Sequence, residues 1–356
     1  MITLFTPSFA DEANTNAQNL SVKEIVARLD PEKIAVTMLH QGAVDPRIAS
    51  RPNTKLIRWQ KHGNTGWLIL QLLREVRDVY FFPREGPLDA AFLTLRRYLH
   101  LKTTVVSYVV SGGLESGPYL PARQRHIREA DAVFANNTHL ARLLKDNMGI
   151  DAAGVVYDGV DRRYFFPAEV HPQDQKQDQK AVAILYAGSL KPLKRVPLVV
   201  RQAARWPQAV FRIAGTGEEE IICRNLAAEL GCKNVEFLGH LPPAQLGEEM
   251  RKSNIFFFPS IVEGHPQVLA QAAATGLPCV AMKVYRPDFV VDRATGFLAE
   301  SDTELAELLD RLICDQELRL RMKRAAIAHI QKFDWDVSSK IWQDAFERLV
   351  ARRRKH

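Results

Sequence analysis

The loop at residues 263–265 carries residue types suited to chemistry: a carboxylate, a glycine and an imidazole in the order Glu-Gly-His. The apolar run at 255–258 predicts a buried strand before this loop. Pro266 suits the first turn of a helix after it, because its missing N–H would be unsatisfied there anyway. The loop therefore precedes a helix N-terminus, whose unsatisfied N–H groups and positive dipole end favour a phosphate. Glu263 is placed to hold a sugar that is attached to such a phosphate.

A second candidate lies in the loop after an expected strand, where Gly188 is followed by Lys191, Lys194 and Arg195. A strand that ends in glycine, with basic residues before the next helix, suits the binding of a diphosphate. Another strand end carries Gly215, and glycine lets a ligand approach the backbone closely. A solvated basic loop and a plain turn remain the alternative interpretations of these two segments.

These segments resemble the signature of the retaining, nucleotide-sugar-dependent glycosyltransferases of the GT-B fold (glycosyltransferase family 4, group 1). The family pattern is Glu, seven residues and Glu, with Gly and often Pro after the first Glu, and it closes with small residues, Gly and Pro. The spacing from Glu263 holds here, but Gln271 occupies the second acidic position. The segment 159–167 also resembles the family segment that precedes the interdomain linker. An ordinary strand–helix–strand unit of an α/β domain is the structural alternative.

The resemblance implies a role for each residue of the candidate site. Glu263 and Lys194 would be catalytic: Glu263 would bond hydroxyls of the donor sugar near the anomeric carbon, and Lys194 would bind the diphosphate. Gln271 would bond the ribose hydroxyls, which an amide can do as donor and acceptor. The full set expected to bind the donor is Gly188, Ser189, Lys194, Gly215, Gly239, His240, Glu263, Gly264, His265, Pro266, Gln267 and Gln271.

Two further positions depart from the family pattern. Ser189 replaces an arginine, so Lys191 or Arg195 could supply the lost phosphate contact. Val109 is the nearest equivalent of a histidine that the family places near the anomeric centre. The departures weaken the catalytic assignment more than the fold.

Two histidines have both a functional and a structural interpretation. Gly239 and His240 are expected to recognise the base, mostly through main-chain groups, but His240 could be a surface turn residue. His265 could be a loop residue that contributes only its backbone.

The N-terminal half resembles the family by topology more than by motif. Its first loop, 11–17, lacks the usual pair of glycines, although asparagine tolerates left-handed backbone. The residues expected on the acceptor side are Asn14, Asn16, Ser111 and Gly112.

Strand and helix patterns alternate through both halves, which predicts parallel sheets covered on both faces. The predicted fold class is α/β of the GT-B type: two Rossmann-like doubly wound domains facing a cleft, with a C-terminal helix that crosses back. The polar run at 173–180 cannot join a core and marks a linker. The predicted parts are an acceptor-binding domain at 1–170, a linker at 171–180, a donor domain at 181–335 and a returning helix at 336–356.

The composition is typical of a soluble globular protein, which is expected in the cytoplasm or peripherally on the inner face of the membrane. Its 356 residues include 46% hydrophobic and 25% charged residues, and no apolar run is long enough to span a membrane. The four cysteines form no CxxC pair, which favours a reduced, cytoplasmic compartment. The net charge of +7 favours anionic partners. The stretch 93–102 mixes basic and apolar residues and could touch an anionic membrane, although an ordinary covering helix explains it as well. The basic tail at 352–355 is expected to be a solvated end.

The functional hypothesis is a retaining glycosyltransferase of cell-surface glycan or glycolipid synthesis. It would move a sugar from a nucleotide diphosphate donor, with UDP first and GDP second, to a hydroxyl of a glycan or lipid-linked acceptor. No metal and no other cofactor are expected, because Lys194 and the helix N-terminus would stabilise the leaving group. The alternative is a non-catalytic protein of the same fold that binds a nucleotide or glycan. A nucleic-acid partner is not expected, because no basic stripe interleaved with aromatic residues is present.

Overall fold

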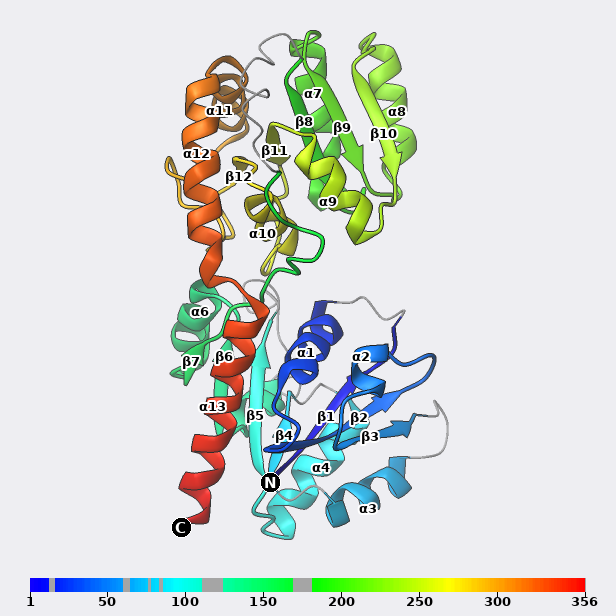
Figure 1. The fold of residues 1–356 in the computed structure, drawn as a ribbon, viewed down its shortest axis with the longest axis vertical. Coiled ribbons are helices and arrows are strands. Elements are labelled where there is room, and N and C mark those ends of the chain that lie inside the picture. Colours follow the sequence, from blue (N-terminus) through cyan, green and yellow to red (C-terminus); the bar gives the residue numbers. More distant parts are fainter. Residues whose placement is uncertain are drawn as a thin grey trace. The chain divides into compact units, whose positions relative to one another are not determined.

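The computed structural model divides the chain into two compact units (Figure 1). It describes residues 1–12, 17–59, 65–75, 78–82, 86–110, 124–168 and 181–355. Unit 1 comprises Met1–Gly159 and Trp335–His356, and unit 2 comprises Val160–Asp334. Each unit is built on one parallel sheet, so the predicted pair of parallel-sheet α/β domains is confirmed.

Unit 1 contains a seven-stranded sheet in the order β3-β2-β1-β4-β5-β6-β7. Neighbouring strands pair in parallel, and the order reverses direction between β1 and β4. Residues of β5 are buried along the whole strand, as expected for a parallel sheet covered on both faces. The strands are β1 (Ile2–Phe9), β2 (Ile34–His40), β3 (Thr54–Arg58), β4 (Val79–Phe81), β5 (Thr104–Val109), β6 (Ala132–Ala135) and β7 (Gly154–Val155).

Helices cover the two faces of this sheet with separate apolar clusters. One cluster joins the sheet to α1 and α13, and the other joins it to α3 and α4. The helices are α1 (Ala17–Arg28), α2 (Pro46–Ala49), α3 (Thr65–Glu75), α4 (Pro87–Tyr98), α5 (Arg125–Arg128), α6 (Thr138–Met148) and α13 (Trp335–Arg354).

Helix α13 returns to unit 1 and packs beside α1, far from it in sequence (Figure 1). Its buried Trp342 lies 4.8 Å from the ring of Phe81 and 4.9 Å from that of Tyr108. At the end of α13, Arg353 donates to the carbonyl of Leu101 at 3.1 Å, and Arg354 pairs with Asp78 at 3.0 Å. The expectation of a solvated basic tail was therefore wrong for Arg353, whose side chain is 27% exposed, but Arg354 is 61% exposed beside Asp78.

Unit 2 contains a six-stranded sheet in the order β10-β9-β8-β11-β12-β13. Its strands also pair in parallel, and the order reverses direction between β8 and β11. The strands are β8 (Ala183–Ala187), β9 (Val210–Ala214), β10 (Val235–Gly239), β11 (Ile255–Phe258), β12 (Cys279–Met282) and β13 (Gly296–Ala299). The helices are η3 (Pro192–Lys194), α7 (Val196–Arg205), α8 (Glu220–Glu229), α9 (Pro243–Arg251), α10 (Gln267–Ala274), α11 (Asp302–Cys314), α12 (Gln316–His329) and η4 (Ile330–Lys332).

The chain enters unit 2 at Val160, earlier than the linker expected at 171–180. Arg162 pairs with Asp334 at 2.9 Å, and Arg251 donates to the carbonyl of Tyr164 at 2.9 Å. These contacts tie the start of unit 2 to its own end and to α9. Residues 171–180 lie outside the described part of the chain.

Candidate functional site

The candidate site of unit 2 lies where the order of its strands reverses. Strands β8 and β11 are neighbours, with Ile184 opposite Ile255, although the two strands are far apart in sequence. The loop at 188–195 follows β8, and the loop at 259–266 follows β11. Both loops therefore leave the carboxyl edge of the sheet at its topological switch point, where open α/β sheets bind their ligands.

The two loops bring Lys194 and Glu263 into contact, with the Lys194 ammonium donating to the Glu263 carboxylate. The side chains are 22% and 11% exposed, so a ligand can reach the pair although most of it is covered. The carbonyl of Leu193 accepts from the amide of Ile261 at 3.2 Å and from the hydroxyl of Ser260 at 3.3 Å. These bonds fasten η3 to the loop after β11. The two residues predicted to be catalytic thus meet in one place.

Glycines join the loops after β8, β9 and β10 in a row. The amide of Gly188 donates to Ala214 at 3.0 Å, and the amide of Gly215 donates to the carbonyl of Gly239 at 2.7 Å. A Cβ on Gly215 would lie 1.8 Å from the carbonyl oxygen of Gly188, and the φ of Gly215 is +135°. Glycine is required there because no other residue allows the two loops to approach so closely.

Helix α10 begins beside Glu263, with Pro266 as its N-cap and no side-chain cap among the described residues. Pro266 precedes the helix instead of occupying its first turn, where the sequence had placed it. The side-chain amide nitrogen of Gln267 is buried and has no hydrogen-bond partner in the described structure. A buried donor of this kind favours a ligand oxygen nearby.

His265 lies half-buried before α10, with its imidazole 4.0 Å from the ring of Phe289. The Nε2 atom of His265 is inaccessible to solvent. Burial lowers the pKa of His265 to about 3, so its ring is neutral at pH 7. The imidazole therefore cannot supply a positive charge to a phosphate.

Comparisons with known proteins show what unit 2 and the fold are similar to. Residues 168–329 match the family model described as "Glycosyl transferases group 1". This part of the chain, which is most of unit 2, is similar to a glycosyltransferase group 1 domain.

Curated proteins that are similar to the chain are also named glycosyltransferases. The chain is 31% identical over 204 residues to a D-inositol 3-phosphate glycosyltransferase of Corynebacterium efficiens, covering 52% of this chain and 48% of the relative. It is 27% identical over 298 residues to the protein of the same name from Corynebacterium aurimucosum, covering 77% of this chain and 66% of the relative. The chain thus spans about half to two thirds of the length of these relatives.

Solved structures show the same fold over nearly the whole chain. The Anabaena protein Alr3699/HepE in complex with UDP superposes with a TM-score of 0.76 at 16% identity, covering 98% of this chain and 100% of that one. The lipopolysaccharide outer core galactosyltransferase WaaB, in its apo form, gives a TM-score of 0.76 at 18% identity, covering 98% and 99%. The fold is that of the GT-B glycosyltransferases.

The structure shows where unit 2 departs from the charges of the family pattern. Ser189 is half-buried and cannot replace a guanidinium. Arg195 pairs with Asp302, whose side chain is 55% exposed. Lys191 is exposed at the N-cap of η3 and forms no ion pair within the described part of the chain. Gln271 is half-buried in the second turn of α10.

Two other residues predicted to bind the donor lie at a strand end of unit 2. His240 is exposed after β10, as its interpretation as a surface turn residue requires. Gly239 has a φ of +68° and open space around the position of a Cβ, so its main chain is accessible. In unit 1, Val109 ends β5 and is buried.

Sequence reasoning missed two aromatic residues beneath the Lys194–Glu263 pair. Tyr186 lies near the end of β8 and Phe258 at the end of β11, and their rings stack with centroids 6.0 Å apart. The Lys194 ammonium lies 5.6 Å from the centre of the Phe258 ring. Their signal in the sequence was the position of an aromatic residue at each of two strand ends that meet at the switch point.

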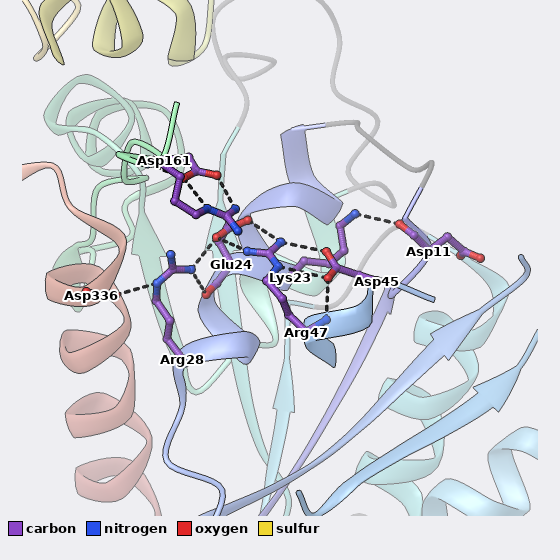
Figure 2. A network of polar contacts seen from close by, with 9 residues as sticks. Asp11, Lys23, Glu24, Arg28, Asp45, Arg47, Asp161 and Asp336 are labelled. Atoms are coloured by element: carbon purple, nitrogen blue, oxygen red, sulfur yellow. Dashed lines mark hydrogen bonds and ion pairs between the residues drawn. The ribbon is translucent and has the colours of Figure 1, made fainter. Parts of the chain in front are cut away.

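A buried polar network holds the stem of the first loop in unit 1 (Figure 2). The carbonyl of Asp11 accepts from the Lys23 ammonium at 2.8 Å, and its carboxylate accepts from the amide of Gln41 at 2.9 Å. Glu24 pairs with Arg47 at 2.8 Å. Burial lowers the pKa of Lys23, and nearby carboxylates oppose that shift. The stem is thus fixed where it leads into the first loop.

The expected acceptor-side residues Asn14, Asn16, Ser111 and Gly112 lie outside the described residues. Across the part of the chain that the structure describes, no group of three or more His, Cys, Asp or Glu residues could hold a metal ion.

Proposed function

We propose that this chain is a retaining glycosyltransferase that moves a sugar from a nucleoside diphosphate sugar to an acceptor hydroxyl. The observation that carries the proposal is the Lys194–Glu263 pair at the switch point of unit 2, beside the N-terminus of α10. A cation and a helix N-terminus suit a diphosphate, and a carboxylate beside them suits sugar hydroxyls. Retention follows from the family resemblance.

The proposed reaction breaks the bond between the anomeric carbon and the β-phosphate oxygen, which keeps the electron pair. The acceptor oxygen bonds to the same carbon, and its proton passes to the departing diphosphate oxygen. Negative charge grows on the departing diphosphate, so groups that stabilise this charge lower the barrier most. In this proposal Lys194 and the main-chain N–H groups at the start of α10 take that role, and no metal is needed.

The donor base in this proposal is uracil, with guanine second. Support comes from the solved neighbour that contains UDP and from a second structure of the same Anabaena protein with UDP-glucose. The acceptor is a glycan or a lipid-linked sugar of the cell surface. The names of the curated relatives add an inositol phosphate as an acceptor to screen.

The first test is thermal stability with saturating UDP, GDP and ADP in turn. A ligand at about 100 times its Kd stabilises the native state by about 2.7 kcal/mol. A shift with one nucleotide names the base, and its sugars are then screened for transfer. No shift with any of the three refutes a preformed donor site.

The second candidate is a non-catalytic nucleotide- or glycan-binding protein of the same fold. It is favoured by Ser189 and Gln271, where two charges of the family pattern are missing. Nucleotide binding without transfer to any acceptor of a broad panel would support it.

We also propose that unit 1 contacts an anionic membrane, on the cytoplasmic side, through the outer surface of α3 and α4. Helix α3 exposes Trp67, Leu70 and Arg74 at helical spacing, and α4 ends in exposed Tyr98 and Leu99. The two helices pack against each other. No helix in the described ranges is long and apolar enough to cross a membrane. Basic residues with exposed aromatic residues favour an anionic lipid surface.

Vesicle flotation tests this contact. The double variant Trp67→Ser/Leu70→Ser should lose binding to vesicles rich in phosphatidylglycerol. The matched control is Ile221→Ser/Ile222→Ser, which removes an equally exposed apolar pair from α8 of unit 2. Equal loss in both variants, or equal binding to neutral vesicles, would contradict the proposal.

A further inference from the structure

Tyr186 connects the loop that carries Lys194 to the sheet beneath it. It lies on β8, is fully buried, and its hydroxyl donates to the carbonyl of Ser189 at 3.0 Å. A Cβ on Gly188 would lie 2.9 Å from that hydroxyl oxygen, so the phenol also fills the space under the loop.

The loop is held residue by residue. Gly188 bonds to Ala214 at 3.0 Å, Leu190 donates to Thr216 at 3.0 Å, and the Tyr186 hydroxyl holds Ser189 between them. Burial raises the pKa of Tyr186, and the Glu263 carboxylate adds to the shift. The hydroxyl therefore keeps its proton at neutral pH and remains a donor.

The ring of Tyr186 also supports Lys194 indirectly, through Phe258. It stacks on Phe258, the last residue of β11, at an interplanar angle of 19°. The Lys194 ammonium lies over the face of Phe258, an arrangement that favours a cation. One side chain thus fixes the backbone before Lys194 and supports the ring under its ammonium.

We propose that Tyr186 is a positioning residue that sets the place of the Lys194 ammonium, and so the affinity of this site for a diphosphate. The effect on diphosphate affinity rests on the proposed function, whereas the effect on the position of Lys194 does not. In this chain the loop lacks the arginine of the family pattern at Ser189, so Lys194 carries more of the phosphate contact.

The first experiment compares binding of UDP and uridine to wild type and Tyr186→Phe by calorimetry. The variant keeps the stacked ring and removes only the hydroxyl. The Kd for UDP should rise about tenfold, as expected for one lost hydrogen bond that holds a contact residue, and the Kd for uridine should not change. The control Ile184→Val weakens the same strand without touching the loop, and its UDP affinity should stay within about twofold.

The second experiment needs no nucleotide. The coupling between Lys194 and Glu263 is measured from urea unfolding of Lys194→Met, Glu263→Gln and the double variant, in wild-type and Tyr186→Phe backgrounds. The coupling should fall by at least half in the Tyr186→Phe background. An unchanged coupling overturns the positioning role even if UDP binds. If wild type does not bind UDP but the coupling falls in the Tyr186→Phe background, the proposed function is refuted and the positioning role is not.

Discussion

Replacing Glu263 by glutamine should make the protein bind UDP more tightly while it loses sugar transfer. In the structure the Lys194 ammonium is paired with the Glu263 carboxylate. A diphosphate must compete with that carboxylate for Lys194, and it is also repelled by it. Glutamine keeps the size and the hydrogen-bonding reach of the side chain but removes both effects. Transfer falls because the donor sugar loses a charged acceptor for its hydroxyls.

The burial of the pair sets the size of the effect. Exposed ion pairs contribute about 0–1 kcal/mol, and breaking a buried pair costs about 3–5 kcal/mol. With side chains 22% and 11% exposed, we assign the Lys194–Glu263 pair about 1–2 kcal/mol. Because about 1.4 kcal/mol is tenfold in Kd, the Kd for UDP should fall about five- to thirtyfold.

Calorimetry with UDP at low and high salt measures this change. The gain should shrink at high salt, because screening weakens the charge interactions that Glu263→Gln removes. Asp310→Asn is the matched control: its side chain is 26% exposed and pairs with Arg205 on the same unit, away from the loop of Lys194. The reasoning is refuted if Glu263→Gln binds UDP more weakly than wild type, or if Asp310→Asn gives the same gain.

Three further predictions follow from contacts in unit 2. Gly215→Ala should weaken UDP binding by more than tenfold, because its Cβ would meet the carbonyl of Gly188; the control Gly231→Ala has a φ of +67° but open space, and calorimetry should show no loss. His265→Phe should make the free energy of unfolding, measured in urea, depend less on pH in the acid range. The pKa of His265 is about 3 in the folded protein and about 6.5 in the unfolded chain. Its contribution to stability is therefore fully present above pH 6.5 and is lost as the pH falls towards 3, at up to about 1.4 kcal/mol per pH unit. Gln271→Glu should improve binding of UDP but not of 2′,3′-dideoxy-UDP in a competition assay, since an acid bonds ribose hydroxyls more strongly; equal gains for both nucleotides would exclude a ribose contact.

Local chemistry explains why some elements were predictable to the residue. The sequence predicts a helix over 138–148, and α6 has these bounds. The side chain of Asn137 caps its start by accepting from Leu140 at 2.7 Å, and Gly149 ends it with a φ of +69°. Both signals are read from residue types alone.

Elements without such signals were missed. Strand β3 lies at the edge of its sheet, and its exposed Lys55 and Arg58 hide the apolar pattern. Strand β7 has two residues, too few for any periodicity. Strand β13 was missed although it is largely buried, since its four residues follow a turn with no preceding helix.

In the candidate site, too, features set by local chemistry were predictable and features set by tertiary contacts were not. Glycine positions and helix starts depend on the local backbone and can be recognised from residue types. Gly188, Gly215 and the start of α10 could therefore be placed from the sequence. Pairings between side chains of different loops depend on which strands become neighbours. Arg195 is a candidate for the phosphate by its place in the loop, but its pairing with Asp302, more than a hundred residues later in the chain, could not be predicted from that place. The bond from Tyr186 to a main-chain carbonyl has no sequence signature at all, because every residue has a carbonyl. Which charged side chains can contact a ligand therefore depends on the partners that the tertiary structure gives them. Residue types alone identify only the candidate side chains.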